Sequence, residues 1–185
     1  EVAAHRMPAT GALVDRLLAS PAYGERWARH WLDLVHYADA DVDSDTQEQK
    51  VAPQAYRYRD WVIEALNRDW PYDAFVKAHV AGDLMPEPQK TAAATGWAVL
   101  GRWFATKDAE IGKNEAEQLA DRVDTITRAV LGLTVACARC HDHKYDPIPT
   151  TDYYALAGVF MNTRKDVVSL GDLETTRLYD AHRKE

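Results

Sequence analysis

Two cysteines and a histidine fall within five consecutive residues, Cys137-Ala138-Arg139-Cys140-His141. Haem carries vinyl groups on neighbouring pyrroles, and two thiols at this spacing can bridge them as thioethers. The histidine that follows directly can then reach the iron from one face as its proximal ligand. The segment predicts one covalent haem c, attached at Cys137 and Cys140, with His141 on the iron.

Three other interpretations of the same cysteines remain open. A thioredoxin-type dithiol usually opens a helix in a βαβ setting, a pattern that this sequence lacks. Zinc could use Cys137, Cys140, His143 and one distant histidine, although no second ligand pair has the usual spacing. The third interpretation is a pair of buried structural cysteines. Haem attachment is favoured over all three.

The second axial position on the iron is the least determined part of the site. We expect His30 there, because it sits between Trp27 and Trp31 in a helical segment suited to a haem wall, and Asp33 could orient its ring. A histidine on such a helix is more often a hydrogen-bonded core residue. The alternatives are an open face, His36, Met161, or His143 from a neighbouring subunit.

The residues around the motif suggest further roles. Arg139 and Lys144 could pair with haem propionates, and Tyr145 could pack against the ring. His143 lies two residues from His141, so the two cannot easily take opposite faces of one haem. We expect it to ligate a haem in a neighbouring subunit, to bond a propionate, or to orient the loop.

Helical periodicity predicts an all-α fold, an irregular helical domain with long loops around the haem. We expect helices over residues 10–18, 21–38, 56–68, 73–80, 115–131 and 151–160. In the second helix, the expected buried stripe consists of Trp27, Trp31, Leu34 and Val35. In the third, we expect Tyr58, Val62 and Leu66 to be buried.

An acidic, polar stretch over residues 39–53 predicts a long loop. Its alternating carboxylates resemble the start of a calcium loop, but Ser44 and Lys50 occupy positions where that template needs Gly and Glu. A solvated acidic loop is therefore favoured over calcium for residues 39–50.

Composition limits the class of protein. A chain of 185 residues, 46% apolar, suits a single haem domain over residues 1–185. A net charge of -7 argues against nucleic acid or an anionic membrane surface as partner. No apolar run approaches the ~20 residues of a membrane span. Since the sequence begins at Glu1 inside helical sequence, we expect a processed piece of a longer protein.

Long segments resemble the planctomycete cytochrome C domain family, specifically the second domain of that name. They are RLLASPAYGERWARHWLDLVHYADA, YRYRDWVIEALNRDWPYDAFV, AGDLMP and DRVDTITRAVLGLTVACARCHDHKYDPIPTTDYYALAGVF. The resemblance implies an exported c-type haem protein with further domains around this one. His36 departs from it, because the family usually has Arg there.

These observations lead to one functional expectation and two alternatives. We expect an electron carrier, rather than an enzyme, that passes electrons to other haem domains or redox proteins. The surplus histidines near the motif suggest a homo-oligomer or filament. The alternatives are a peroxidase-like haem enzyme with an open distal face and a zinc-binding interaction module without haem.

Overall fold

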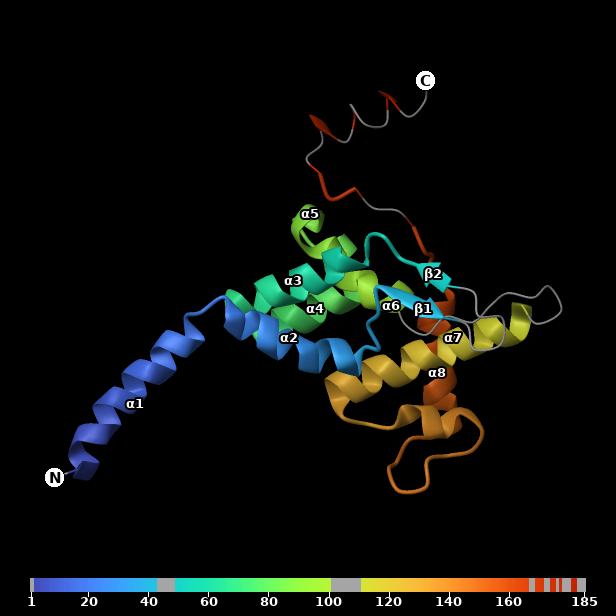
Figure 1. Cartoon of the computed structure of the whole chain (residues 1–185). Helices are drawn as coiled ribbons and strands as arrows, with labels where there is room; N and C mark the ends of the chain where they lie inside the picture. Colours follow the sequence, from blue (N-terminus) through green and yellow to red (C-terminus); the bar gives the residue numbers. More distant parts are fainter. Residues whose placement is uncertain are drawn as a thin grey trace.

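The computed structural model confirms the all-α fold and adds one short pair of strands (Figure 1). It describes residues 2–42, 49–100, 111–166, 169–171, 174, 175, 177, 181 and 182. The longer helices are α1 (Val2–Leu18), α2 (Ala22–Leu34), α3 (Ala55–Asn67), α4 (Tyr72–Ala81), α7 (Ile111–Ile126) and α8 (Thr150–Met161). Shorter elements are β1 (Ala40–Val42), β2 (Gln49–Val51), η1 (Gly82–Leu84), α5 (Pro88–Thr91), η2 (Ala92–Gly96), α6 (Trp97–Leu100), η4 (Thr127–Leu131) and η5 (Val135–Arg139).

The larger hydrophobic core forms where α2, α3 and α4 pack together with η2 and α6. Its innermost side chains include Tyr58 and Val62, as the sequence predicted for the third helix. The close approach of α2 to α3 depends on Gly24, where an added Cβ would lie 2.6 Å from the Ile63 carbonyl oxygen. The Gly24 amide also donates to Asn67 Oδ1 at 2.8 Å, which fixes the register of the two helices.

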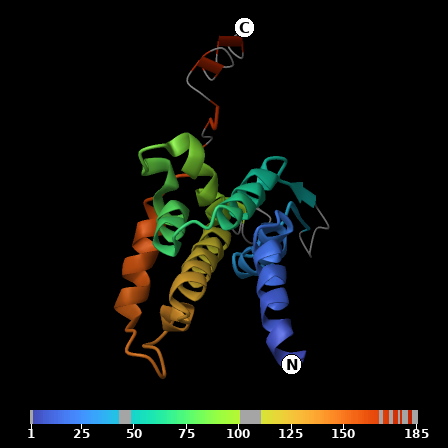
Figure 2. The ribbon, with the colours of Figure 1, turned by 90° about the vertical axis from the view of Figure 1, so that its left-hand side faces the viewer.

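A second, smaller core lies between α7, α8 and η5. It is built on Val123, Val135, Ala138, Tyr153 and Ala157, all buried. Phe160 on α8 packs against both cores and so joins them. Figure 2 shows α8 and α7 side by side, with α1 and α2 on the other side of α7.

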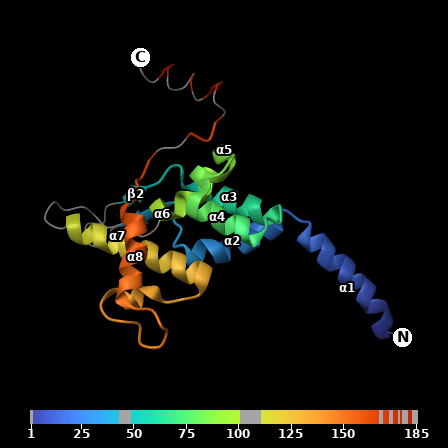
Figure 3. The same ribbon diagram turned by 180° about the vertical axis from the view of Figure 1, so that it is seen from behind.

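The C-terminal end of α7 positions the predicted site. The helix continues into the π-helical turn η4 and stops at Gly132, whose left-handed φ of 66° favours glycine. The chain then reverses through η5 and a loop before entering α8 at Thr150. Seen from behind in Figure 3, this connection projects below α7 and α8, at the edge opposite α5.

Three sequence predictions about the first fifty residues were wrong. The first helix begins at Val2 rather than at residue 10, and Figure 1 shows α1 extending away from the rest of the chain. The predicted loop over residues 39–53 contains the antiparallel pair β1 and β2, with Ala40 opposite Val51. Trp27 and Leu34 are about half exposed, because α2 turns its small residues Gly24 and Ala28 towards α3.

Candidate functional site

The cysteine motif lies on the single 3-10 turn η5 and the residues that follow it. A 3-10 helix has three residues per turn, so side chains three positions apart share one side of it. Val135 and Ala138 occupy the inner side and are buried against α7 and α8. Cys137 and Cys140, which are also three apart, are both exposed, with free thiols. The fold therefore presents both sulfurs at the surface of one turn.

His141 follows immediately and is exposed as well. Its Nδ1 lies 2.7 Å from the Asp142 carbonyl oxygen. A carbonyl only accepts hydrogen bonds, so this contact places a proton on Nδ1, and in the neutral ring the lone pair is then on Nε2. A neutral imidazole with a bare Nε2 is the form that ligates a metal. The local backbone contact thus fixes which ring nitrogen of His141 faces away from the chain, and ligation of haem iron by His141 stays a prediction.

The second histidine of the loop has a different environment. The side chain of His143 is only 6% exposed. Its Nδ1 accepts the Asp146 amide at 2.9 Å and its Nε2 lies 3.0 Å from Thr134 Oγ1. Its own amide donates to the Ile148 carbonyl at 2.8 Å. Both ring nitrogens are engaged inside the loop, which favours the predicted loop-orienting role over ligation in a neighbouring subunit.

Two contacts fasten the motif to the helices on either side. Arg139 Nη2 lies 3.0 Å from Glu117 Oε1 on α7, and this hydrogen bond raises the pKa of the guanidinium. Tyr154 on α8 donates its hydroxyl to the Arg139 carbonyl at 3.1 Å. Arg139 therefore has a protein carboxylate as partner, with which a haem propionate would have to compete.

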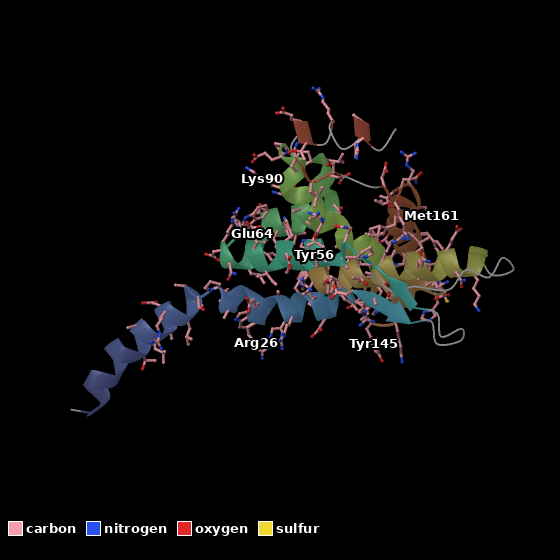
Figure 4. The ribbon with its side chains drawn as sticks, turned by 45° about the horizontal axis from the view of Figure 1, so that its top comes forward. Arg26, Tyr56, Glu64, Lys90, Tyr145 and Met161 are labelled. Atoms are coloured by element: carbon pink, nitrogen blue, oxygen red, sulfur yellow. The ribbon has the colours of Figure 1, made fainter. Side chains whose placement is uncertain are left out.

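Tyr145 is 82% exposed, with Lys144 Nζ 5.1 Å from its ring centre. In the view of Figure 4, Tyr145 and Met161 lie on either side of α7. Met161 is the last residue of α8, and its side chain is exposed. Tyr145 is thus exposed beside the loop, and its packing against a haem stays a prediction.

The histidines considered for the second axial position lie on other elements. His30 is exposed on α2 and its ring packs against Trp27, with ring centres 5.2 Å apart. It lies on the helix face opposite Ala28, the residue buried against the core. His36 follows α2 with a left-handed φ of 54°, and its Nδ1 lies 3.2 Å from Asp121 Oδ1 on α7. Neither His30 nor His36 is therefore the buried, hydrogen-bonded core residue that a histidine on such a helix often is.

Comparison with known proteins decides the family. Residues 2–165 match the family described as a protein of unknown function, DUF1549, or PSCyt2. The chain belongs to this family. The match confirms the planctomycete cytochrome C domain predicted from the sequence, and it covers every helix from α1 to α8. No curated protein and no solved structure matches the chain.

In this DUF1549 chain, the histidine most deeply involved in packing is one that sequence reasoning did not single out. His79 on α4 is 2% exposed, and its ring packs against Phe75, Trp31, Tyr58 and Trp61. Burial lowers its pKa from 6.5 to about 4. The signal was present in the sequence, because Phe75, Ala78 and His79 recur at helical spacing on one side of α4.

Metal sites of other kinds find little support in the described part of this DUF1549 domain. Among those residues, no three His, Cys, Asp or Glu side chains form a group that could hold a metal ion. The zinc set of Cys137, Cys140 and His143 is therefore not assembled there. The calcium prediction depends on Asp43 and Asp45, which lie outside the described residues. Within the described ranges, no helix is long and apolar enough to cross a membrane.

Proposed function

We propose that this chain is a c-type cytochrome domain that carries one haem, bound through thioethers to Cys137 and Cys140, with His141 as proximal ligand. The single observation that carries the proposal is the presentation of all three groups at one turn. Both thiols are free and exposed, and the contact of His141 Nδ1 with the Asp142 carbonyl leaves Nε2 as the ring nitrogen that a metal can reach. These are the groups that covalent attachment and iron ligation need.

When bound there, haem would supply reversible transfer of one electron. The residues of the chain have the remaining tasks. His143 fixes the loop through the Asp146 amide and Thr134. Glu117 holds Arg139, and so restrains the turn between the two cysteines. Tyr145 offers an exposed aromatic surface beside the motif.

An exported location and an electron-transfer partner follow from this proposal. Covalent haem attachment takes place on the export side of the cell membrane, so the chain would work in the periplasm, at the cell surface or outside. Its net charge of -7 favours a partner with a basic contact surface. Other haem domains or redox proteins are the partners we propose.

Whole-protein mass spectrometry tests the attachment. The chain is produced with an export leader in cells that contain the haem-attachment apparatus. The mass should exceed that of the polypeptide by about 616 Da, the mass of one haem b. Changing Cys137→Ser and Cys140→Ser together should abolish the increase. A matched His30→Ala variant should keep it, because His30 lies on α2 and takes no part in forming the thioether bonds.

An unmodified mass would overturn the proposal, provided that a known c-type cytochrome acquires its haem in the same cells. Production without the attachment apparatus should give the unmodified mass in every variant. His141→Ala should weaken iron ligation while the thioether bonds still form. Its absorption spectrum in the reduced state should therefore change even where its mass does not.

A haem enzyme with an open distal face is the second candidate function. The observation that favours it is the placement of three of the other histidines: His36 contacts Asp121, His79 is in the core, and His143 is engaged within its loop. Carbon monoxide binding to the reduced protein distinguishes the candidates. A six-coordinate, low-spin spectrum unchanged by carbon monoxide would exclude the enzyme and support the electron carrier.

A further inference from the structure

Inside the larger core, the side chains of Trp31, Tyr58 and His79 form a hydrogen-bonded network. His79 Nδ1 lies 2.8 Å from the Phe75 carbonyl oxygen, so it must carry a proton and donate it there. Nε2 then has only a lone pair, and Tyr58 Oη lies 3.1 Å from it. The indole N–H of Trp31 lies 2.9 Å from both Tyr58 Oη and His79 Nε2. In this arrangement, the Tyr58 hydroxyl donates its proton to His79.

The hydrogen-bonded network is buried, so its central groups are shielded from water. Tyr58 and His79 are 1% and 2% exposed, and they are surrounded by Phe75, Trp61 and Trp97. A phenol and an imidazole are costly to bury compared with apolar side chains of similar shape. A proton that passed from Tyr58 to His79 would remain in the core, because within the described part of the chain the His79 ring is hydrogen-bonded only to the Phe75 carbonyl, Tyr58 and Trp31.

A second tyrosine with its own proton acceptor lies next to the first. The rings of Tyr37 and Tyr58 have centres 6.0 Å apart. Tyr37 is half-buried and donates its hydroxyl to the carboxylate of Asp39, which is exposed. Arg59 Nη1 lies 3.5 Å from the other oxygen of that carboxylate. The pair therefore connects the buried phenol with the protein surface.

We propose that Tyr58 and His79 form a proton-coupled redox site and that Tyr37 and Asp39 are its outlet to the surface. The site accepts an oxidising equivalent from a strong one-electron oxidant, such as a radical formed from peroxide. Tyr58 loses one electron to the oxidant, and its phenolic proton moves along the existing hydrogen bond to His79 Nε2. The products are a neutral tyrosyl radical, an imidazolium and the reduced oxidant.

The second step returns the core to its starting state. Tyr37 transfers one electron to the Tyr58 radical, and the proton on His79 Nε2 moves back to Tyr58 Oη. The Tyr37 phenolic proton passes to the Asp39 carboxylate at the same time. A reductant in solution then supplies the electron to Tyr37, and Asp39 returns the proton. Until a reductant arrives, the radical remains on Tyr58. This route needs no haem, so it stands or falls separately from the proposed cytochrome function.

Photo-oxidation of the full chain tests the proposal. The chain is illuminated with a ruthenium polypyridyl sensitiser and persulfate, frozen, and measured by electron paramagnetic resonance. A tyrosyl radical should persist after the radicals on exposed tyrosines have decayed. Tyr58→Phe should lose this persistent signal, whereas Tyr72→Phe, at a tyrosine that is 60% exposed, should keep it. A persistent signal of wild-type size in Tyr58→Phe would overturn the redox site.

The outlet has its own measurement. Ascorbate added after illumination should reduce the persistent radical more slowly in Tyr37→Phe than in the wild type, and equal rates would overturn the outlet. Labelling histidine with nitrogen-15 removes any dependence on how the variants fold. In the wild-type chain, the persistent radical should show magnetic coupling to one imidazole nitrogen, and absence of that coupling would overturn the proton transfer to His79.

Discussion

The core around His79 and the loop around His141 place the same side chain in opposite environments. Both ring nitrogens of His79 are hydrogen-bonded, and the ring is buried among aromatic side chains. His141 is exposed, and its one side-chain hydrogen bond within the described residues, to the adjacent Asp142 carbonyl, leaves Nε2 available. The first histidine contributes to stability because both of its ring nitrogens have partners. The second is suited to ligation because, in the part of the chain that the structure describes, its Nε2 has none.

His143 shows that sequence proximity does not decide between these two environments. It lies two residues from His141, yet its side chain is buried and its ring nitrogens are engaged. The loop therefore contains its own small polar core, which holds the backbone while His141 and the cysteines stay accessible. Because their burial and hydrogen bonding differ, substitutions at the three histidines should affect the stability of the fold very differently.

The largest loss of stability is expected for His79→Ala. Removing the ring leaves a cavity and deprives Tyr58 and Trp31 of a partner, so the free energy of unfolding should fall by about 3–5 kcal/mol. Urea denaturation of the chain measures it. His30→Ala is the matched control on an exposed helix face and should change stability by less than about 0.5 kcal/mol. Similar losses of stability in the two variants would contradict the assignment of a core role to His79.

Acidification should produce the next largest effect. The pKa of His79 is about 4 in the folded chain and 6.5 when the ring is exposed. The unfolded state therefore binds this proton more readily, and stability falls as the pH drops from about 6.5 towards 4. The full contribution is about 3 kcal/mol, lost by pH 4 and constant below it.

Carboxylates also titrate in this range, so the informative quantity is a difference between two proteins. Unfolding free energies of the wild type and of His79→Gln, measured from pH 7 to pH 4, isolate the His79 contribution. The gap between the two proteins should narrow as the pH falls. A constant gap would mean that burial does not oppose protonation of His79.

A smaller, local effect is expected for His143→Ala. Its hydrogen bonds to the Asp146 amide and Thr134 would be lost, at about 1–3 kcal/mol. Hydrogen exchange at the Asp146 amide should accelerate more than exchange in α3. Lys144→Ala, at the neighbouring exposed residue, is the control and should leave exchange unchanged. Unaltered protection in His143→Ala would show that the loop is held by other contacts.

The smallest change in stability is expected at the residues assigned the chemistry. Cys137→Ser with Cys140→Ser should alter the unfolding free energy of the haem-free chain by less than about 0.5 kcal/mol, because both side chains are exposed. Thermal and urea unfolding measure this. A loss of stability as large as that expected for His79→Ala would show that the two cysteines stabilise the fold as the His79 core does. It would contradict the distinction between a core that provides stability and an exposed turn that provides reactive groups.

Much of the fold could be predicted from periodicity. The sequence indicated the helices α3 and α8 to within a few residues, and it identified Tyr58 and Val62 as core residues. It was right about Val35 and Trp31 in the buried stripe of α2 but wrong about Trp27 and Leu34, because periodicity favours large apolar residues. The helix instead packs through Gly24 and Ala28, whose small size allows α3 to approach.

The motif Cys137-Ala138-Arg139-Cys140-His141 was determined by sequence alone, since thiol spacing and an adjacent histidine are properties of the covalent chain. Only the tertiary structure decided which face of that turn is buried, because the inner residues Val135 and Ala138 pack against distant helices. The same holds for His79, which meets Trp31 and Tyr58 across 48 and 21 residues of sequence. Such hydrogen bonds depend on how helices dock, and no local pattern encodes that.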